Sequence, residues 1–157
     1  MTATVHASAV LAGSRAVLIR GPSGAGKSRL ALALIEAARV GRLPFASLVG
    51  DDRVHLSPTG GRLLVRPAAA LAGLIEMRGV GIVRLAYEPC AVVGMVVDLG
   101  AGPDRLPAAE QRHTVIEGIM LPRLAVAAGE DALPPLIALI TCLPKADGLP
   151  HKTVLGT

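Results

Sequence analysis

The chain has 157 residues, 52% of them hydrophobic and 18% charged, a composition that suits one folded domain and excludes a largely disordered chain. Its longest apolar stretches, AVVGMVV and LPPLIALITCL, fall short of the roughly 18–20 residues that cross a bilayer. The first residues lack the basic region of a signal peptide, so we expect a cytoplasmic protein that does not bind membranes. The net charge is +4, but the basic residues stand singly and one Tyr and one Phe offer little stacking surface, which argues against nucleic-acid binding.

The cysteines and most histidines give no sign of a metal site. Cys90 and Cys142 are far apart in apolar surroundings, without the spacing of a zinc site, and we expect both to be buried, reduced thiols. His55, His113 and His151 are expected to be surface or packing residues.

The first half of the chain predicts an alternation of strands and one helix. Residues 16–21 form a short apolar run that ends in glycine, which is typical of a buried strand. Residues 28–40 carry leucines among alanines and predict a helix, and residues 47–52 predict a second strand that ends on two carboxylates. Residues 54–65 place turn residues between two β-like runs, which predicts a hairpin.

The second half is less regular. Residues 90–99 predict another buried strand, and residues 108–119 predict a helix. The remainder is rich in proline and receives no assignment. We therefore expect an α/β fold with a mixed sheet and flanking helices in residues 1–130, followed by a variable tail in residues 131–157.

A glycine-rich segment between the first strand and the helix carries the clearest chemistry. GPSGAGKS fits the P-loop pattern G-x-x-x-x-G-K-[ST], in which backbone N–H groups surround phosphate oxygens, the lysine reaches the β- and γ-phosphates and the last hydroxyl binds Mg²⁺. The competing interpretation is an ordinary glycine-rich turn. The predicted nucleotide-binding residues are Gly21, Pro22, Ser23, Gly24, Ala25, Gly26, Lys27 and Ser28.

Two further segments add acidic and basic groups. LVGDD ends a strand on Asp51 and Asp52; one carboxylate could serve the metal and the other could accept a proton, unless both simply occupy a solvated turn. IEMRGVGIV places Glu76 and Arg78 beside Gly79 and Gly81, where Glu76 could bind metal and Arg78 could neutralise phosphate. The alternative for that segment is an exposed ion pair on an edge strand.

Together these three segments resemble the catalytic, C-terminal domain of HPr kinase/phosphorylase, in a short form found in proteobacteria. VGDDRV and EMRGVGI match two of the family's motifs, and the second is the discriminating one. The resemblance covers roughly residues 6–130 and implies a single P-loop domain of the HPr kinase and PEP carboxykinase type.

The resemblance also implies roles for individual residues. Asp52 would accept the proton of the substrate hydroxyl, Glu76 would join Ser28 on Mg²⁺, and His6, located 21 residues before Lys27, would assist. Asp51, Arg78, Gly79 and Gly81 would form a wall of the phosphate site, and Arg105 would match a catalytic arginine.

The implied activity is ATP-dependent phosphorylation of a serine on an HPr-like phosphocarrier protein, by a homo-oligomer that is hexameric in the family. The family's basic phosphorolysis motif appears here as AVAAGE (125–130), so only weak phosphorolysis is expected. A small-molecule kinase and a non-catalytic nucleotide-sensing module are the alternatives.

Overall fold

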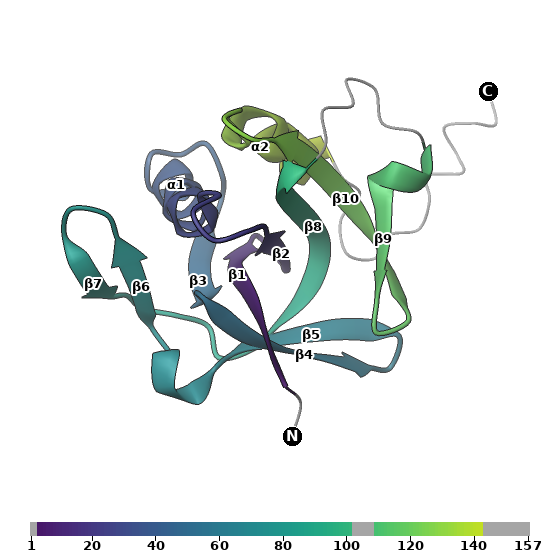
Figure 1. Ribbon diagram of the computed structural model, residues 1–157, viewed down its shortest axis with the longest axis horizontal. Coiled ribbons are helices and arrows are strands. Elements are labelled where there is room, and N and C mark those ends of the chain that lie inside the picture. The colour runs from purple at the N-terminus through teal and green to yellow at the C-terminus, as the bar shows by residue number, and fades with distance from the viewer. Residues whose placement is uncertain (1–2, 102–108, 143–157) are drawn as a thin grey trace.

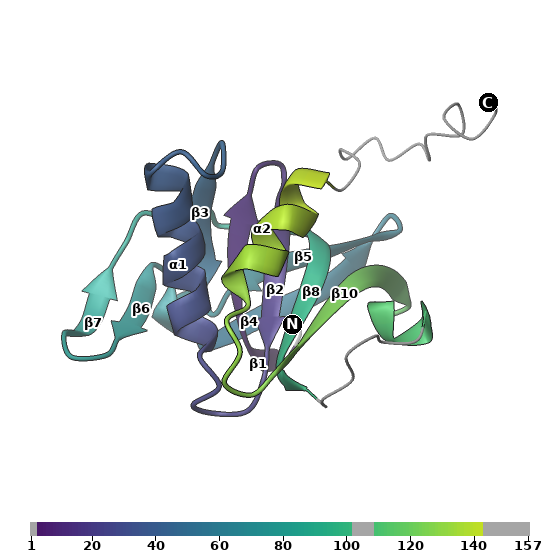
Figure 2. The same cartoon turned by 90° about the horizontal axis from the view of Figure 1, so that it is seen from above.

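The structure is a computed structural model that describes residues 3–101 and 109–142. It is a mixed α/β fold in which eight strands form one sheet, two further strands form a separate hairpin, and the described helices lie on one face of the sheet (Figures 1 and 2). None of the described helices is long and apolar enough to cross a membrane. In chain order, the elements are β1 (Thr4–Ala12), β2 (Arg15–Arg20), α1 (Lys27–Arg39), β3 (Ala46–Gly50), β4 (Arg53–Thr59), β5 (Arg62–Pro67), a short 3-10 helix (Ala69–Leu71), β6 (Leu74–Met77), β7 (Gly81–Arg84), β8 (Ala91–Ala101), a second 3-10 helix (Ala109–Arg112), β9 (His113–Ile116), β10 (Ile119–Ala127) and α2 (Leu133–Cys142).

The main sheet curls until it closes on itself. Its strand order is β2-β1-β4-β5-β8-β10-β9, with β3 paired to β1, and an additional parallel pairing of β8 with β2 turns the first five strands into a ring. One hydrophobic cluster fills the inside of this curl; it includes Ala7, Leu18, Val65 and Val96. A second cluster lies between the other face of the sheet and the helices, and contains Val17, Leu34 and Leu136.

The predictions for the first half of the chain are confirmed. The strand expected at 16–21 is β2, the helix expected at 28–40 is α1, and the strand expected at 47–52 is β3, which ends at Gly50 just before the two aspartates. The hairpin expected at 54–65 is formed by β4 and β5, and the strand expected at 90–99 is β8.

The helix predicted over residues 108–119 is wrong. Only Ala109–Arg112 is helical there, as a single 3-10 turn, and the rest forms β9 and the start of β10. Glu117 and Gly118 have φ angles of 50° and 78°, the left-handed pair of a two-residue hairpin turn, and this turn pairs β9 with β10. Pairing of β9 with β10 therefore overrides the local preference for helix.

The burial predicted for the two thiols is also wrong. Cys90 lies in the loop before β8 and Cys142 is the last residue of α2, and both are free and exposed. Apolar neighbours in sequence do not bury a side chain that lies on the outer side of its element.

Helix α2 had no prediction because two prolines open it. Pro134 and Pro135 occupy its first turn, where a missing N–H removes no helical hydrogen bond, and the Asp131 carboxylate accepts from the Leu133 N–H. Leu136 is completely buried in the same cluster as the leucines of α1. The part of the tail that the structure describes thus packs on the main core; residues 143–157 lie outside the described residues.

We predict that Leu136→Ala lowers the free energy of unfolding by about 2–5 kcal/mol, because it removes a buried leucine from the interface between α2 and the sheet. Leu133→Ala, in the same helix but only half-buried, is the matched control and should lose clearly less. Urea unfolding followed by circular dichroism measures both. Equal, small losses would show that α2 contributes little to this core.

Candidate functional site

The glycine-rich loop lies between β2 and α1, as its sequence predicts. Gly26 is the N-cap of α1 with φ 99°, a left-handed conformation that glycine adopts without strain, and no side chain caps the helix. The first N–H groups of α1 are therefore available to an anion, which the positive end of the helix dipole attracts.

The start of this loop is held by β8. A Cβ atom at Gly21 would meet the Leu99 carbonyl oxygen at 3.0 Å, so the loop begins in direct contact with the β8 backbone. Lys27 is buried, and its Nζ donates to the carbonyl oxygens of Gly21 at 2.8 Å and Pro22 at 3.0 Å. The ammonium group therefore lies inside the loop, where phosphate oxygens would enter.

The two aspartates after β3 point to different places. Asp51 is buried, and its carboxylate accepts hydrogen bonds from Ser8 Oγ at 2.5 Å and from Ser28 Oγ at 2.8 and 2.9 Å. Asp52 has φ 68° and its side chain is 63% exposed; it pairs with His6 Nε2 at 3.1 Å. The left-handed residue turns the chain so sharply that one carboxylate supports the loop serine while the other faces solvent.

The segment IEMRGVGIV forms a hairpin rather than one strand. Glu76 belongs to β6, Arg78 lies in the turn and Gly81 begins β7. Within the described part of the chain, no ion pair joins Glu76 to Arg78, so the exposed pair considered as an alternative is not formed.

One pocket of about 710 Å³ brings the three segments together. The predicted residues that line it are His6, Ser23, Gly24, Gly26, Lys27, Ser28, Asp52, Glu76, Arg78, Gly79 and Gly81. Asp51 lies behind Ser28 rather than on the pocket surface, and Gly21, Pro22 and Ala25 belong to the loop without lining the pocket. Arg105 lies outside the described residues.

Sequence reasoning missed some of the lining. Ser8, Arg29, Leu32 and Met77 also contribute. Ser8 is a buried hydroxyl in β1, next to the apolar second half of the strand, which is a signal for a polar partner, but only the fold reveals that this partner is Asp51.

The polar groups of the pocket fit Mg²⁺ bound together with a phosphorylated substrate. Mg²⁺ prefers oxygen ligands and is often held by one or two carboxylates and substrate phosphates. Ser28 and Glu76 supply such oxygens in the pocket, and Asp51 accepts a hydrogen bond from the Ser28 hydroxyl. In the described residues no group of three or more His, Cys, Asp or Glu side chains is arranged to hold a metal by itself.

Residues 1–88 match the family model described as the HPr Serine kinase C-terminal domain. The chain belongs to this family. Among curated relatives it is 37% identical over 131 residues to the HPr kinase/phosphorylase of Azoarcus sp. (strain BH72), covering 73% of this chain and 39% of the relative. It is 32% identical over 138 residues to that of Geobacillus thermodenitrificans, covering 80% of this chain and 42% of the relative.

A solved structure extends the likeness to nearly the whole chain. The HPr(Ser) kinase/phosphatase from Coxiella burnetii matches with a TM-score of 0.69 and 25% identity, covering 98% of this chain and 99% of that one. The match to the HPr kinase/phosphorylase of Mycoplasma mycoides is shorter, with 38% identity over 81 residues, 52% of this chain and 24% of the relative. The chain thus spans less than half the length of these curated relatives.

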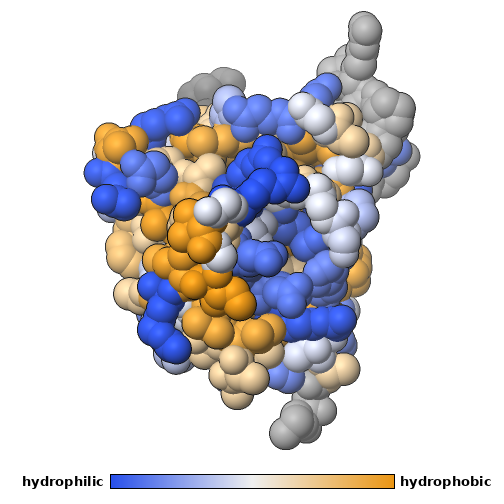
Figure 3. All heavy atoms as spheres, turned by 60° about the vertical axis from the view of Figure 1, so that its left-hand side comes forward, coloured by the Kyte–Doolittle hydropathy of each residue, from blue (hydrophilic) through white to orange (hydrophobic). Residues whose placement is uncertain are grey.

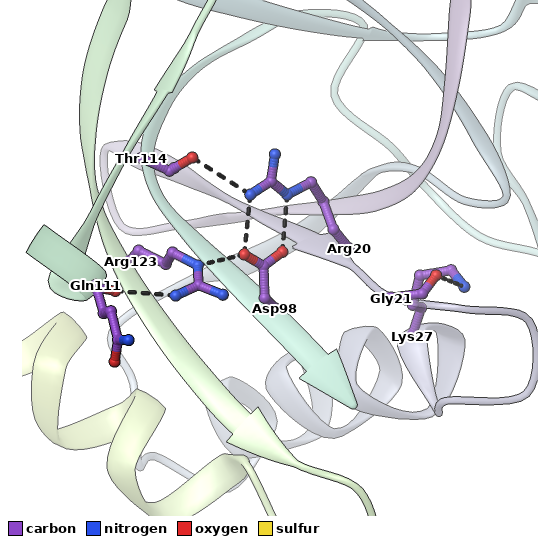
Figure 4. Close-up of polar contacts among 7 residues, drawn as sticks. All are labelled: Arg20, Gly21, Lys27, Asp98, Gln111, Thr114 and Arg123. Carbon is purple, nitrogen blue, oxygen red and sulfur yellow. Dashed lines mark hydrogen bonds and ion pairs between the residues drawn. The ribbon is translucent and has the colours of Figure 1, made fainter. Parts of the chain in front are cut away.

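On the face of the sheet opposite the two α-helices, a cluster of two arginines and one aspartate links strands β2, β8 and β10 (Figure 4). Asp98 on β8 lies directly across from Arg20 on β2, which donates Nε at 2.8 Å and Nη2 at 2.9 Å. Arg123 on β10 donates Nε to the same carboxylate at 2.5 Å and Nη1 to the Gln111 carbonyl oxygen at 3.0 Å. Since Arg20 immediately precedes Gly21, this cluster fixes the strand end from which the glycine-rich loop departs.

We predict that Asp98 makes stability depend on pH. Burial raises the pKa of this carboxyl, but hydrogen bonds and charge from Arg20 and Arg123 outweigh burial and hold the pKa below its usual 3.8. The folded state therefore binds the proton more weakly than the unfolded state. The stabilisation is complete at neutral pH and decreases as the pH falls below about 4.

Asp98→Asn should lower the free energy of unfolding by about 1–3 kcal/mol at pH 7, since two part-buried guanidinium groups lose their counter-ion. The difference from the parent protein should shrink at pH 3. Chemical denaturation at the two pH values measures this, and a difference that does not depend on pH would contradict the assignment.

Proposed function

We propose that the protein transfers the γ-phosphoryl group of ATP to a serine hydroxyl of an HPr-like phosphocarrier protein. The observation that carries the proposal is the single pocket in which Lys27 and Ser28 of the glycine-rich loop lie with the Asp52–His6 pair and Glu76. Membership of the HPr serine kinase family supports the choice of acceptor.

The residues divide between nucleotide and acceptor. The N–H groups at the start of α1 and the ammonium of Lys27 hold the β- and γ-phosphates as a P-loop does. Ser28 and Glu76 provide oxygens for Mg²⁺, with Asp51 orienting the Ser28 hydroxyl. Mg²⁺, when bound, neutralises charge on the phosphate oxygens.

Asp52 is the proposed proton acceptor. Its carboxylate is exposed at the pocket, whereas Asp51 is already occupied by two serine hydroxyls. His6 contacts Asp52 and keeps the carboxylate over the pocket. Transfer therefore depends mainly on positioning and electrostatic stabilisation, with Asp52 taking the hydroxyl proton as the bond to phosphorus forms.

The test is to incubate the protein with ATP, Mg²⁺ and the HPr-like proteins encoded in the same genome, and to identify phosphoserine by mass spectrometry. Lys27→Met, which keeps the buried stem and removes the charge, is the inactive control. If no acceptor gains phosphoserine while ATP binds normally, the proposal is wrong and a nucleotide-sensing role is favoured.

We predict that the two aspartate variants differ. Asp52→Asn should reduce kcat by at least 100-fold with ATP affinity nearly unchanged, because the loss concerns the acceptor's proton. Asparagine also tolerates the left-handed backbone, so folding is preserved. Asp51→Asn should instead weaken Mg²⁺-dependent ATP binding, because Ser28 loses its charged partner. Steady-state kinetics and calorimetry distinguish the two, and equal effects on both parameters would contradict the division of roles.

The reverse reaction should be weak. Phosphorolysis needs inorganic phosphate beside phosphoserine, and holding two anions together requires fixed positive charge. Here AVAAGE contributes exposed Ala128 and Glu130 at the end of β10, and Arg123 is bound to Asp98. Arg78 remains as an arginine in the pocket.

We therefore expect pyrophosphate release from phosphoserine-HPr, at millimolar phosphate, to be much slower than the forward reaction. Release at the forward rate would contradict this expectation. It would identify Arg78 as the residue to test next.

A further inference from the structure

We propose that the exposed apolar edge of the β6–β7 hairpin, formed by Val80 and Ile82, is the docking surface for the protein that presents its serine to the pocket. The proposal rests on the proposed function, since it concerns how the acceptor protein binds. Val80 and Ile82 are 70% and 72% exposed, the most exposed large apolar side chains in the described part of the chain.

This edge is continuous with the pocket. Met77, Arg78, Gly79 and Gly81 of the same hairpin line the pocket wall, and Ile82 lies directly across the strand pair from Glu76. Figure 3, in which the β6–β7 side of Figure 1 is turned forward, shows apolar side chains gathered next to hydrophilic ones on that side. An acceptor whose hydroxyl enters the pocket must therefore cover this edge.

The hairpin is firmly attached, so its exposed residues are presented in a fixed position. Ile75 is buried in the core beneath α1, and Val83 packs against the same cluster. At the base of the hairpin the Leu85 N–H donates to the Gly73 carbonyl oxygen at 2.7 Å. A preorganised apolar edge loses little conformational entropy on binding.

Charge indicates the chemistry of the partner. Arg29 and Arg78 line the pocket, and Arg84 is exposed two residues after Ile82, on the same face of β7. Within residues 3–101 and 109–142, no ion pair includes Arg78 or Arg84. The surface thus fits a protein segment with apolar side chains beside its serine and carboxylates at the margin.

The same charges argue against a second copy of this chain as the occupant. In a two-fold symmetric contact through this edge, each copy would place the same surface on its partner. Arg78 and Arg84 of both copies would then be gathered in one small interface, and such an accumulation of like charge is unfavourable.

The experiment compares Val80→Ser and Ile82→Ser with the matched control Val115→Ser. Val115 is also an exposed valine, 60% accessible. It lies on β9, the last strand of the main sheet, on the side of the molecule away from the hairpin (Figure 1). For each variant we would measure the affinity for the HPr-like carrier by calorimetry with a non-hydrolysable ATP analogue, the rate of transfer, the affinity for ATP and the sedimentation coefficient.

The expected result is a loss of carrier affinity of about tenfold or more for each hairpin variant. Truncating an apolar side chain near the centre of a protein–protein interface has an effect of this size. ATP affinity and sedimentation should be unchanged, and Val115→Ser should behave like the parent protein. Loss of carrier binding by the hairpin variants would support the docking surface. If the parent protein bound the carrier but produced no phosphoserine, that result would contradict the proposed function and leave the docking surface standing.

Four results would overturn the docking surface, and three of them concern the variants. They are unchanged carrier affinity in both hairpin variants, an equal loss in Val115→Ser, and a changed oligomeric state of the hairpin variants, which would assign the edge to contacts between copies. Absence of any carrier binding by the parent protein would overturn it as well.

Discussion

The carboxylate of Asp51 joins the parts of the molecule on which the site depends. It follows β3, accepts from Ser8 on β1 and accepts from Ser28 at the start of α1, so one buried charged group connects two strands and the glycine-rich loop. A buried carboxylate is stable only when it is well hydrogen-bonded, and among the described residues no buried side-chain nitrogen or oxygen lacks a partner. The loop is therefore held in place by the same bonds that make burial of Asp51 tolerable.

The closed curl of the sheet makes this arrangement possible. Because β1 pairs with β2 on one side and with β3 on the other, Ser8, the end of β2 and the end of β3 are brought together at the start of α1, and the pairing of β8 with β2 closes the curl. Asp98, held between Arg20 and Arg123, keeps β2, β8 and β10 in register from the opposite face. The two faces of the sheet thus differ: the pocket proposed to bind phosphate lies on the helix side, and the Asp98 cluster fixes the strand ends on the other.

Several helices and strands were predictable from hydrophobic and turn patterns within a short stretch of sequence. The leucines and alanines of α1, the apolar run of β2 and the turn residues between β4 and β5 are each sufficient over a short window. The pattern in 108–119 misled because a hairpin turn through Glu117 lacks the usual asparagine or aspartate. Strand β1 carries several small and polar residues, and besides its neighbour β2 it pairs with β3 and β4, which are distant in sequence.

The candidate site was predictable where motifs are contiguous and unpredictable where the fold assembles it. The loop of residues 21–28 and the motif around Glu76 could be found from sequence, although not the hairpin that the motif forms, and the structure places both at one pocket. The different surroundings of Asp51 and Asp52 depend on one left-handed residue, and the partnership of Ser8 with Asp51 joins residues that are 43 positions apart. Neither relation leaves a local pattern.

The most direct test of the central claim is calorimetric titration of ATP, with and without Mg²⁺, into the parent protein, Ser28→Ala and Ser23→Ala. Ser23 is an exposed serine of the same loop that also lines the pocket but does not bond to Asp51. If the Asp51–Ser28 pair organises the site, the parent protein and Ser23→Ala should bind ATP at least tenfold more tightly with Mg²⁺. Ser28→Ala should lose most of that difference. An equal effect of Mg²⁺ on all three proteins would contradict the account.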